Sequence, residues 1–149
     1  MTLPSPNSPQ RAGDDGPARE KLVALRIALL RLHKSLLEME RRSYEREHGK
    51  VNAGELFRLV VDDPQFSWLH NISEFVVRID ETLTGEAPVA AADAIVAFDL
   101  ARKMFVPTES GDAFQKMYFH AIHNDPAVVM EHAELARLFS TESSGSQHD

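Results

Sequence analysis

A long leucine-rich stripe near the start of the chain constrains its fold most strongly. Its apolar residues recur every three or four positions, at Leu22, Leu25, Leu29, Leu32, Leu36 and Met39. This spacing places them on one face of an α-helix. The apolar face is widened to well over half of the circumference by Val23, Ile27, Leu30 and Leu37. Such a helix must be covered from several sides, so the sequence predicts an all-α bundle around it.

Local start and stop signals divide the rest of the chain into shorter helices. Gly49 is a typical stop after the long helix. New helices are expected to start at Asn52 with Glu55, at Asp63-Pro64, at Ser110-Gly111-Asp112 and at Asn124-Asp125-Pro126, and another is expected over about residues 90–106. Pro64 and Pro126 suit the first helical position, where the missing N–H costs nothing. The sequence therefore predicts a single compact bundle of five to six helices.

The apolar residues of these shorter helices indicate which faces turn inward. The expected helix after Asp63 runs without a break to about Leu83. In the helix near residues 90–106, the inward residues are expected to be Ile95, Phe98 and Phe105. In the next helix they are expected to be Phe114, Met117, Tyr118 and Ala121.

The length of 149 residues suits one domain. Residues 1–18 and 141–149 are rich in polar residues, Pro and Gly and have little to bury. We therefore expect a disordered N-terminal tail over 1–18, a helical bundle domain over 19–140 and a disordered C-terminal tail over 141–149.

Composition excludes several classes of chemistry and location. The chain has no cysteine, which excludes disulfides, thiolate nucleophiles and sulfur-ligated zinc. Its first twenty residues lack an apolar run of the secretory type, and charges such as Arg26 and Arg31 interrupt the richest apolar stretch. We therefore expect a cytoplasmic protein that does not enter a membrane.

Charge argues against nucleic-acid binding. The formal net charge is −7, and residues 50–149 hold seven Lys and Arg against sixteen Asp and Glu. This part of the chain repels phosphate, and no basic stripe balances it. No nucleic-acid partner is expected.

Seven histidines suggest a metal site, but their spacing gives little support. His120 and His123 have a suitable separation, yet they lie opposite the apolar face of their helix, as surface histidines do. His33 and His132 fall within apolar stripes, where a hydrogen-bond partner is a simpler outcome than ligation. We expect no cofactor and no metal, with these four histidines as the weak alternatives.

The candidate binding surface is a polar cluster at the end of the long helix, close in sequence to a turn with an acidic pair. Its members are Arg41, Arg42, Tyr44, Glu45, His48, Asp62 and Trp68. One interpretation is a solvated face of ion pairs such as Arg41 with Glu45. The other is a docking surface, in which the aromatic rings supply area and the arginines supply charge. No catalytic motif accompanies the cluster, so no catalytic residue is assigned.

Residues 20–85 resemble a family of small, uncharacterised helical proteins of bacteria. The resemblance rests on short matches such as Glu40-Arg41, Tyr44-Glu45, His48-Gly49, Asp63-Pro64 and Trp68-Leu69. It implies a bacterial origin and a helical domain, and it transfers no activity, cofactor or site residue.

The surplus of apolar residues on the first helix is the main guide to function. It favours a non-enzymatic helical module that binds another protein or itself, as a homodimer through the first helix and the helix that starts at Pro64. The alternative is a bundle that binds a small ligand or a metal, with or without catalysis.

Overall fold

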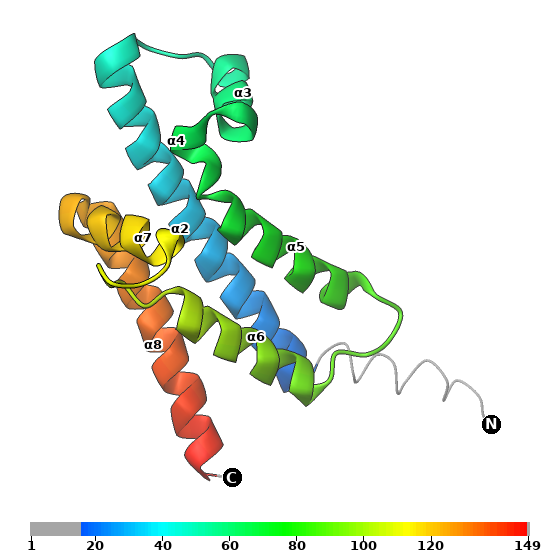
Figure 1. Cartoon of the computed structure of the whole chain (residues 1–149). Coiled ribbons are helices and arrows are strands. Elements are labelled where there is room, and N and C mark those ends of the chain that lie inside the picture. Colours follow the sequence, from blue (N-terminus) through cyan, green and yellow to red (C-terminus); the bar gives the residue numbers. More distant parts are fainter. Residues whose placement is uncertain (1–15, 149) are drawn as a thin grey trace.

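A computed structural model of the chain describes residues 16–148, with their side chains up to residue 141. These residues form seven helices and no strand (Figure 1). The helices are α2 (Pro17–His48), α3 (Ala53–Asp62), α4 (Pro64–Ser67), α5 (His70–Thr84), α6 (Ala91–Met104), α7 (Ala113–Asn124) and α8 (Pro126–His148). The predicted all-α bundle is confirmed.

The structure describes only part of the two predicted tails. Residues 1–15, which make up most of the expected N-terminal tail, lie outside the described part of the chain. At the other end, α8 continues to His148, past the expected boundary at residue 140. The side chains of 142–149 are outside the described set, so tails without fixed structure stay a prediction.

The long helix α2 is the centre of the bundle. Its stripe residues Leu22, Leu25, Leu29, Leu32 and Leu36 are buried. The helices α5, α6 and α8 all pack against α2 along its length (Figure 1). The helix ends before Gly49, whose φ of 86° lies in the region that glycine adopts without strain, as predicted for this stop.

Polar contacts fix α5 along α2. Arg26 of α2 forms an ion pair with Asp80 of α5. About two helical turns before Arg26 on α2, Arg19 Nη1 donates to the carbonyl oxygen of Leu83 at 3.0 Å. Both contacts join residues more than fifty positions apart, so they define how the two helices lie together.

The predicted caps are confirmed. The Asn52 side chain accepts from the Glu55 N–H at 2.8 Å, and the Glu55 carboxylate accepts from the Asn52 N–H at 2.9 Å. Asp112 starts α7 in the same reciprocal way with Gln115. Asp125 starts α8, and one of its carboxylate oxygens accepts from the backbone N–H of Ala127 at 2.9 Å.

The single helix expected from Pro64 to Leu83 is wrong, because the structure divides it into α4 and α5. Between them the chain makes tighter bonds over three residues, from Leu69 N–H to the Phe66 oxygen and from Ile72 N–H to the Leu69 oxygen. This turn lets Trp68 pack against Phe114 of α7 while α5 lies on α2. It also gives seven helices where five to six were expected.

Two residues expected to point inward are exposed. Ile95 of α6 is 52% exposed and Met117 of α7 is 38% exposed. The α6 face that packs inward is formed by Phe98 and by Ala94, Ala97 and Ala101, and the small side chains of the three alanines allow close approach to neighbouring helices. Ile95 lies outside that face because α6 is apolar on more than one side.

Candidate functional site

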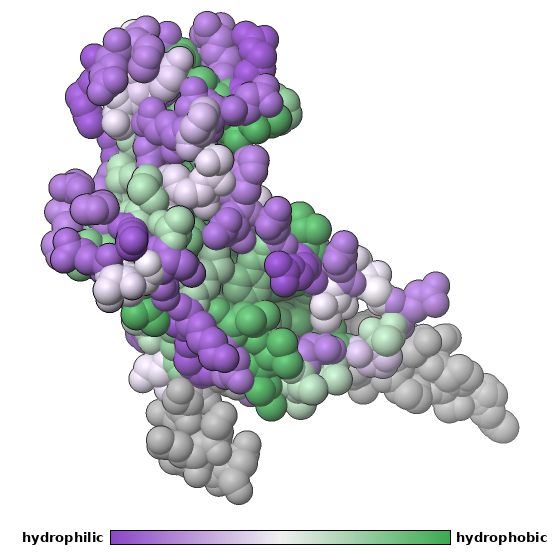
Figure 2. All heavy atoms as spheres, viewed as in Figure 1, coloured by the Kyte–Doolittle hydropathy of each residue, from purple (hydrophilic) through white to green (hydrophobic). Residues whose placement is uncertain are grey.

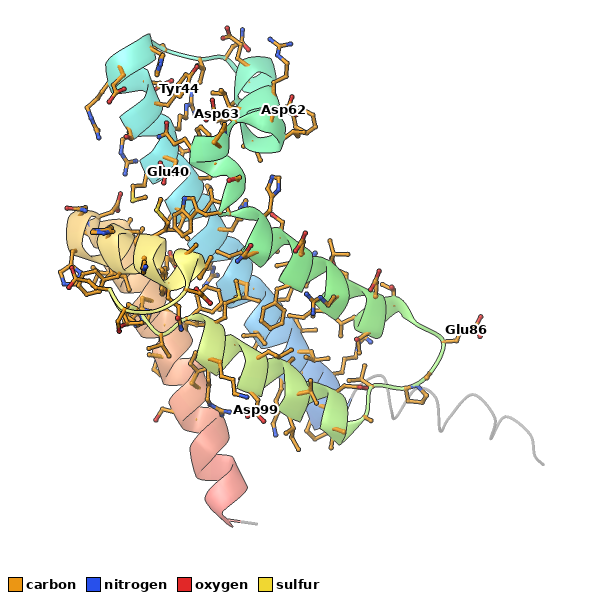
Figure 3. The ribbon with its side chains drawn as sticks, in the orientation of Figure 1. Glu40, Tyr44, Asp62, Asp63, Glu86 and Asp99 are labelled. Carbon is orange, nitrogen blue, oxygen red and sulfur yellow. The ribbon has the colours of Figure 1, made fainter. Side chains whose placement is uncertain are left out.

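The predicted polar cluster lies at the end of the bundle where α2, α3 and α4 meet (Figure 3). Arg41 forms ion pairs with Glu38 and Glu45, and its Nη2 lies 3.4 Å from the Val51 carbonyl oxygen. Glu45 accepts from the Val51 N–H at 3.0 Å, and this bond, aided by Arg41, lowers the pKa of the Glu45 carboxyl. These groups hold the connection between α2 and α3.

Arg42 and Trp68 point toward other helices. Arg42 forms an ion pair with the buried carboxylate of Asp125, which joins α2 to the start of α8. Trp68 Nε1 donates to Glu40 Oε2 at 2.9 Å. The seven predicted residues therefore do not form one continuous surface.

The sequence reasoning missed Glu40, which is the buried carboxylate of this region. Glu40 is 6% exposed, and its second oxygen accepts from Gln65 Nε2 at 2.9 Å. Two side-chain donors from the α4 segment thus meet one acid on α2. The sequence signal was spacing, because Glu40 lies four residues after Leu36 and therefore on the same buried face of α2.

Tyr44, His48 and Asp62 lie nearer to solvent. The Tyr44 ring stacks on His48 with centroids 4.2 Å apart. Tyr44 also lines an open groove of about 380 Å³ together with Asp62 and Asp63. Figure 3 shows these three residues at the same end of the molecule. Asp63 accepts from the Gln65 N–H at 2.8 Å, which is the predicted cap of α4.

Two histidines of the apolar stripes have hydrogen-bond partners within the chain. His33 Nε2 lies 3.2 Å from Ser73 Oγ, and burial, with the nearby His70, lowers the pKa of His33. His132 Nδ1 lies 2.6 Å from the Tyr118 hydroxyl oxygen, and burial lowers the pKa of His132. Burial also raises the pKa of the Tyr118 hydroxyl.

His120 and His123 are exposed, as their position opposite the apolar face of α7 predicts. His123 Nδ1 pairs with the carbonyl oxygen of Phe119 at 2.8 Å. Among the described residues, no group of three or more histidine and acidic side chains is arranged to hold a metal ion.

A second concave surface is an apolar groove between α5 and α6, which sequence reasoning did not predict. It has a volume of about 590 Å³. Its apolar lining comes from Leu22 of α2, Phe75 and Ile79 of α5, and Val96, Leu100 and Met104 of α6. Glu74 and Arg78 of α5 and Asp93 of α6 add charge to the lining. We call this surface the α5–α6 groove.

The exposed apolar surface of α6 includes the groove residues Val96 and Leu100 and extends to Ile95, which is not part of the groove lining. Val96 is 57% exposed and Leu100 is 46% exposed, and Ile95 lies beside them. Figure 2 shows apolar surface gathered over α6 and the space between α5 and α6, with polar side chains around it. A helix with apolar residues on both faces is typical of a buried position, yet α6 lies at the surface. The sequence signal was the presence of Ile95, Val96 and Leu100 in α6 in addition to the apolar residues of its inward face.

Comparisons of the chain with protein-family models, with curated proteins and with solved structures gave no match. Over the described residues, no helix combines the length and apolar character needed to cross a bilayer.

Proposed function

We propose that this chain is a non-enzymatic helical module that acts by binding another polypeptide in the α5–α6 groove. The observation that carries the proposal is the coincidence of this groove with the exposed apolar face of α6. A large contiguous apolar patch on the surface of a soluble protein is typical of a binding site. Scattered apolar residues would not support the same conclusion.

The shape of the groove suits a helix as the bound element. Its walls, α5 and α6, have 15 and 14 residues, which corresponds to about 21 Å at about 1.5 Å per residue. An amphipathic helix of about four turns would fill that length and contact both walls through residues spaced three and four apart. Charges in the lining, at Glu74, Arg78 and Asp93, would face its polar edges.

A small ligand in the same groove is the second candidate. The volume of about 590 Å³ falls within the range of small-molecule sites. Arg78 would then face an acidic group on an otherwise apolar molecule. Native mass spectrometry of the purified chain separates the two, because a bound small molecule and a bound polypeptide add very different masses.

Selection of phage-displayed amphipathic helical peptides against the purified chain tests polypeptide binding. Val96→Asp places a charge in the apolar lining of the groove. It should raise the dissociation constant of selected peptides at least about tenfold. The matched control is Val77→Asp, because Val77 is 53% exposed on α5 and is not among the residues that line the groove.

Peptides that bind the wild type and Val77→Asp chains, and bind Val96→Asp weakly, support the proposal. Failure to enrich any peptide, or equal binding by both variants, would contradict it. A small molecule that copurifies with the wild type and is lost from Val96→Asp would replace it with the second candidate.

A further inference from the structure

The outer face of α6 carries a short stripe with an acidic residue at one end, two apolar residues in the middle and a basic residue at the other end. Two such stripes that run in opposite directions would place apolar residues against apolar residues and each acid against a base. Its members are Asp93, Val96, Leu100 and Lys103, separated by three, four and three residues. All four are exposed, and the first three also line the α5–α6 groove. The spacing is that of residues which meet a facing helix.

The geometry points to a second copy of this chain as the occupant of this surface, packed through α6 about a two-fold axis. This inference rests on the proposed function and names the partner. In an antiparallel pair of α6 helices, Val96 of each copy faces Leu100 of the other. Asp93 of each copy then faces Lys103 of the other, so opposite charges meet at both ends.

Charge selects this arrangement over the parallel one. In a parallel two-fold pair each residue faces its own equivalent, so Asp93 meets Asp93 and Lys103 meets Lys103. Like charges opposed in this way are unfavourable, whereas the antiparallel pair matches both. A two-fold arrangement repeats every contact and closes on itself, as isologous interfaces do.

The two charged groups are available for such a pair. Asp93 Oδ2 accepts from the Ala90 N–H at 2.9 Å, which leaves its other oxygen for a partner. Within the described part of the chain, the ammonium of Lys103 forms no ion pair. The nearby Asp99 is already paired with Arg102 of the same helix.

Charge reversal across the pair gives the decisive experiment. Lys103→Glu should raise the dimer dissociation constant at least about tenfold, because it places two acids opposite each other at both ends. The double variant Asp93→Lys with Lys103→Glu restores opposite charges and should return the constant to within a few-fold of the wild type. Light scattering and analytical ultracentrifugation at micromolar concentration measure it.

Lys116→Glu is the matched control, because it makes the same charge change at an exposed lysine of α7. Its dimer should be as tight as that of the wild type. Circular-dichroism melting of each variant separates loss of the dimer from loss of the fold, since Asp93 also caps α6.

Two outcomes would overturn the inference. A chain that stays monomeric at micromolar concentration, yet binds selected peptides in a manner sensitive to Val96→Asp, would remove the second copy and leave the proposed function intact. A dimer insensitive to both Lys103→Glu and Val96→Asp would place the interface elsewhere, such as at the partly exposed Val23, Ile27 and Leu30 of α2.

Discussion

At the scale of single residues, two polar pairs join side chains of different helical segments. Glu40 accepts from Trp68 and so ties the α4 segment to α2. The Tyr118 hydroxyl forms a hydrogen bond with His132 and so ties α7 to α8. Each pair is at least half-hidden from water, where an unsatisfied polar group costs more than the bond itself contributes. Loss of one partner should therefore be more costly than loss of both.

Trp68→Phe tests this asymmetry. It leaves one oxygen of the buried Glu40 without its donor and should lower the free energy of unfolding by about 1–3 kcal/mol. The same substitution in a Glu40→Leu background should cost less, because no carboxylate is left unpaired. Urea denaturation followed by circular dichroism measures both values. Equal losses in the two backgrounds would show that only ring packing against Phe114 matters.

The histidines make stability depend on pH. Burial lowers the pKa of His132 from 6.5 in the folded chain, and that of His33 in the same direction. Below about pH 6.5 the unfolded chain therefore binds more protons, and the free energy of unfolding should fall as the pH falls toward about 5. His132→Gln should make this fall shallower, while His33 keeps part of it. Urea titrations across this pH range measure the free energy of unfolding of both chains. Equal slopes against pH for the wild type and His132→Gln would contradict the contribution assigned to His132.

At the scale of helices, the local signals in the sequence were the most reliable. The caps at Asn52, Asp63, Asp112 and Asp125 were predictable because a cap involves residues only two or three positions apart. The break at Trp68 was not predictable, because it depends on Glu40 and Phe114, which are distant in the sequence. The inward face of α6 was misjudged at Ile95 because periodicity cannot choose between two apolar faces.

Asp63 provides the corresponding test for a helix start. Asp63→Ala should lower the free energy of unfolding by about 0.5–2 kcal/mol, because the Gln65 N–H loses its acceptor. Asp63→Asn should retain most of that stability, since its side-chain oxygen still accepts. Asp62→Ala is the matched control at an exposed neighbour that caps nothing. Thermal and urea melts that rank Asp63→Asn with Asp63→Ala would contradict a capping role.

At the scale of the whole molecule, the candidate surfaces come from how the helices share α2. The α5–α6 groove exists because α5 and α6 both pack on α2 and leave a space between them. The spacing of Phe75, Val96 and Leu100 predicts helices, but it does not reveal that their faces border one groove. The predicted cluster around Arg41 was found in the sequence because its members lie close together there. Only the three-dimensional arrangement shows that these members face different neighbours. Arg41 contacts the connection to α3, Trp68 packs on α7 and Arg42 pairs with the start of α8.

The packing of α2 on α8 also has a consequence for synthesis. The leucine stripe of α2 leaves the ribosome before α8, which follows all the other described helices in the chain (Figure 1). Throughout translation of the intervening helices, one side of that stripe faces water with no partner. Transiently exposed apolar surface is what makes nascent chains prone to aggregate and what chaperones cover. The newborn chain therefore passes through a vulnerable period that ends only when α8 packs on α2.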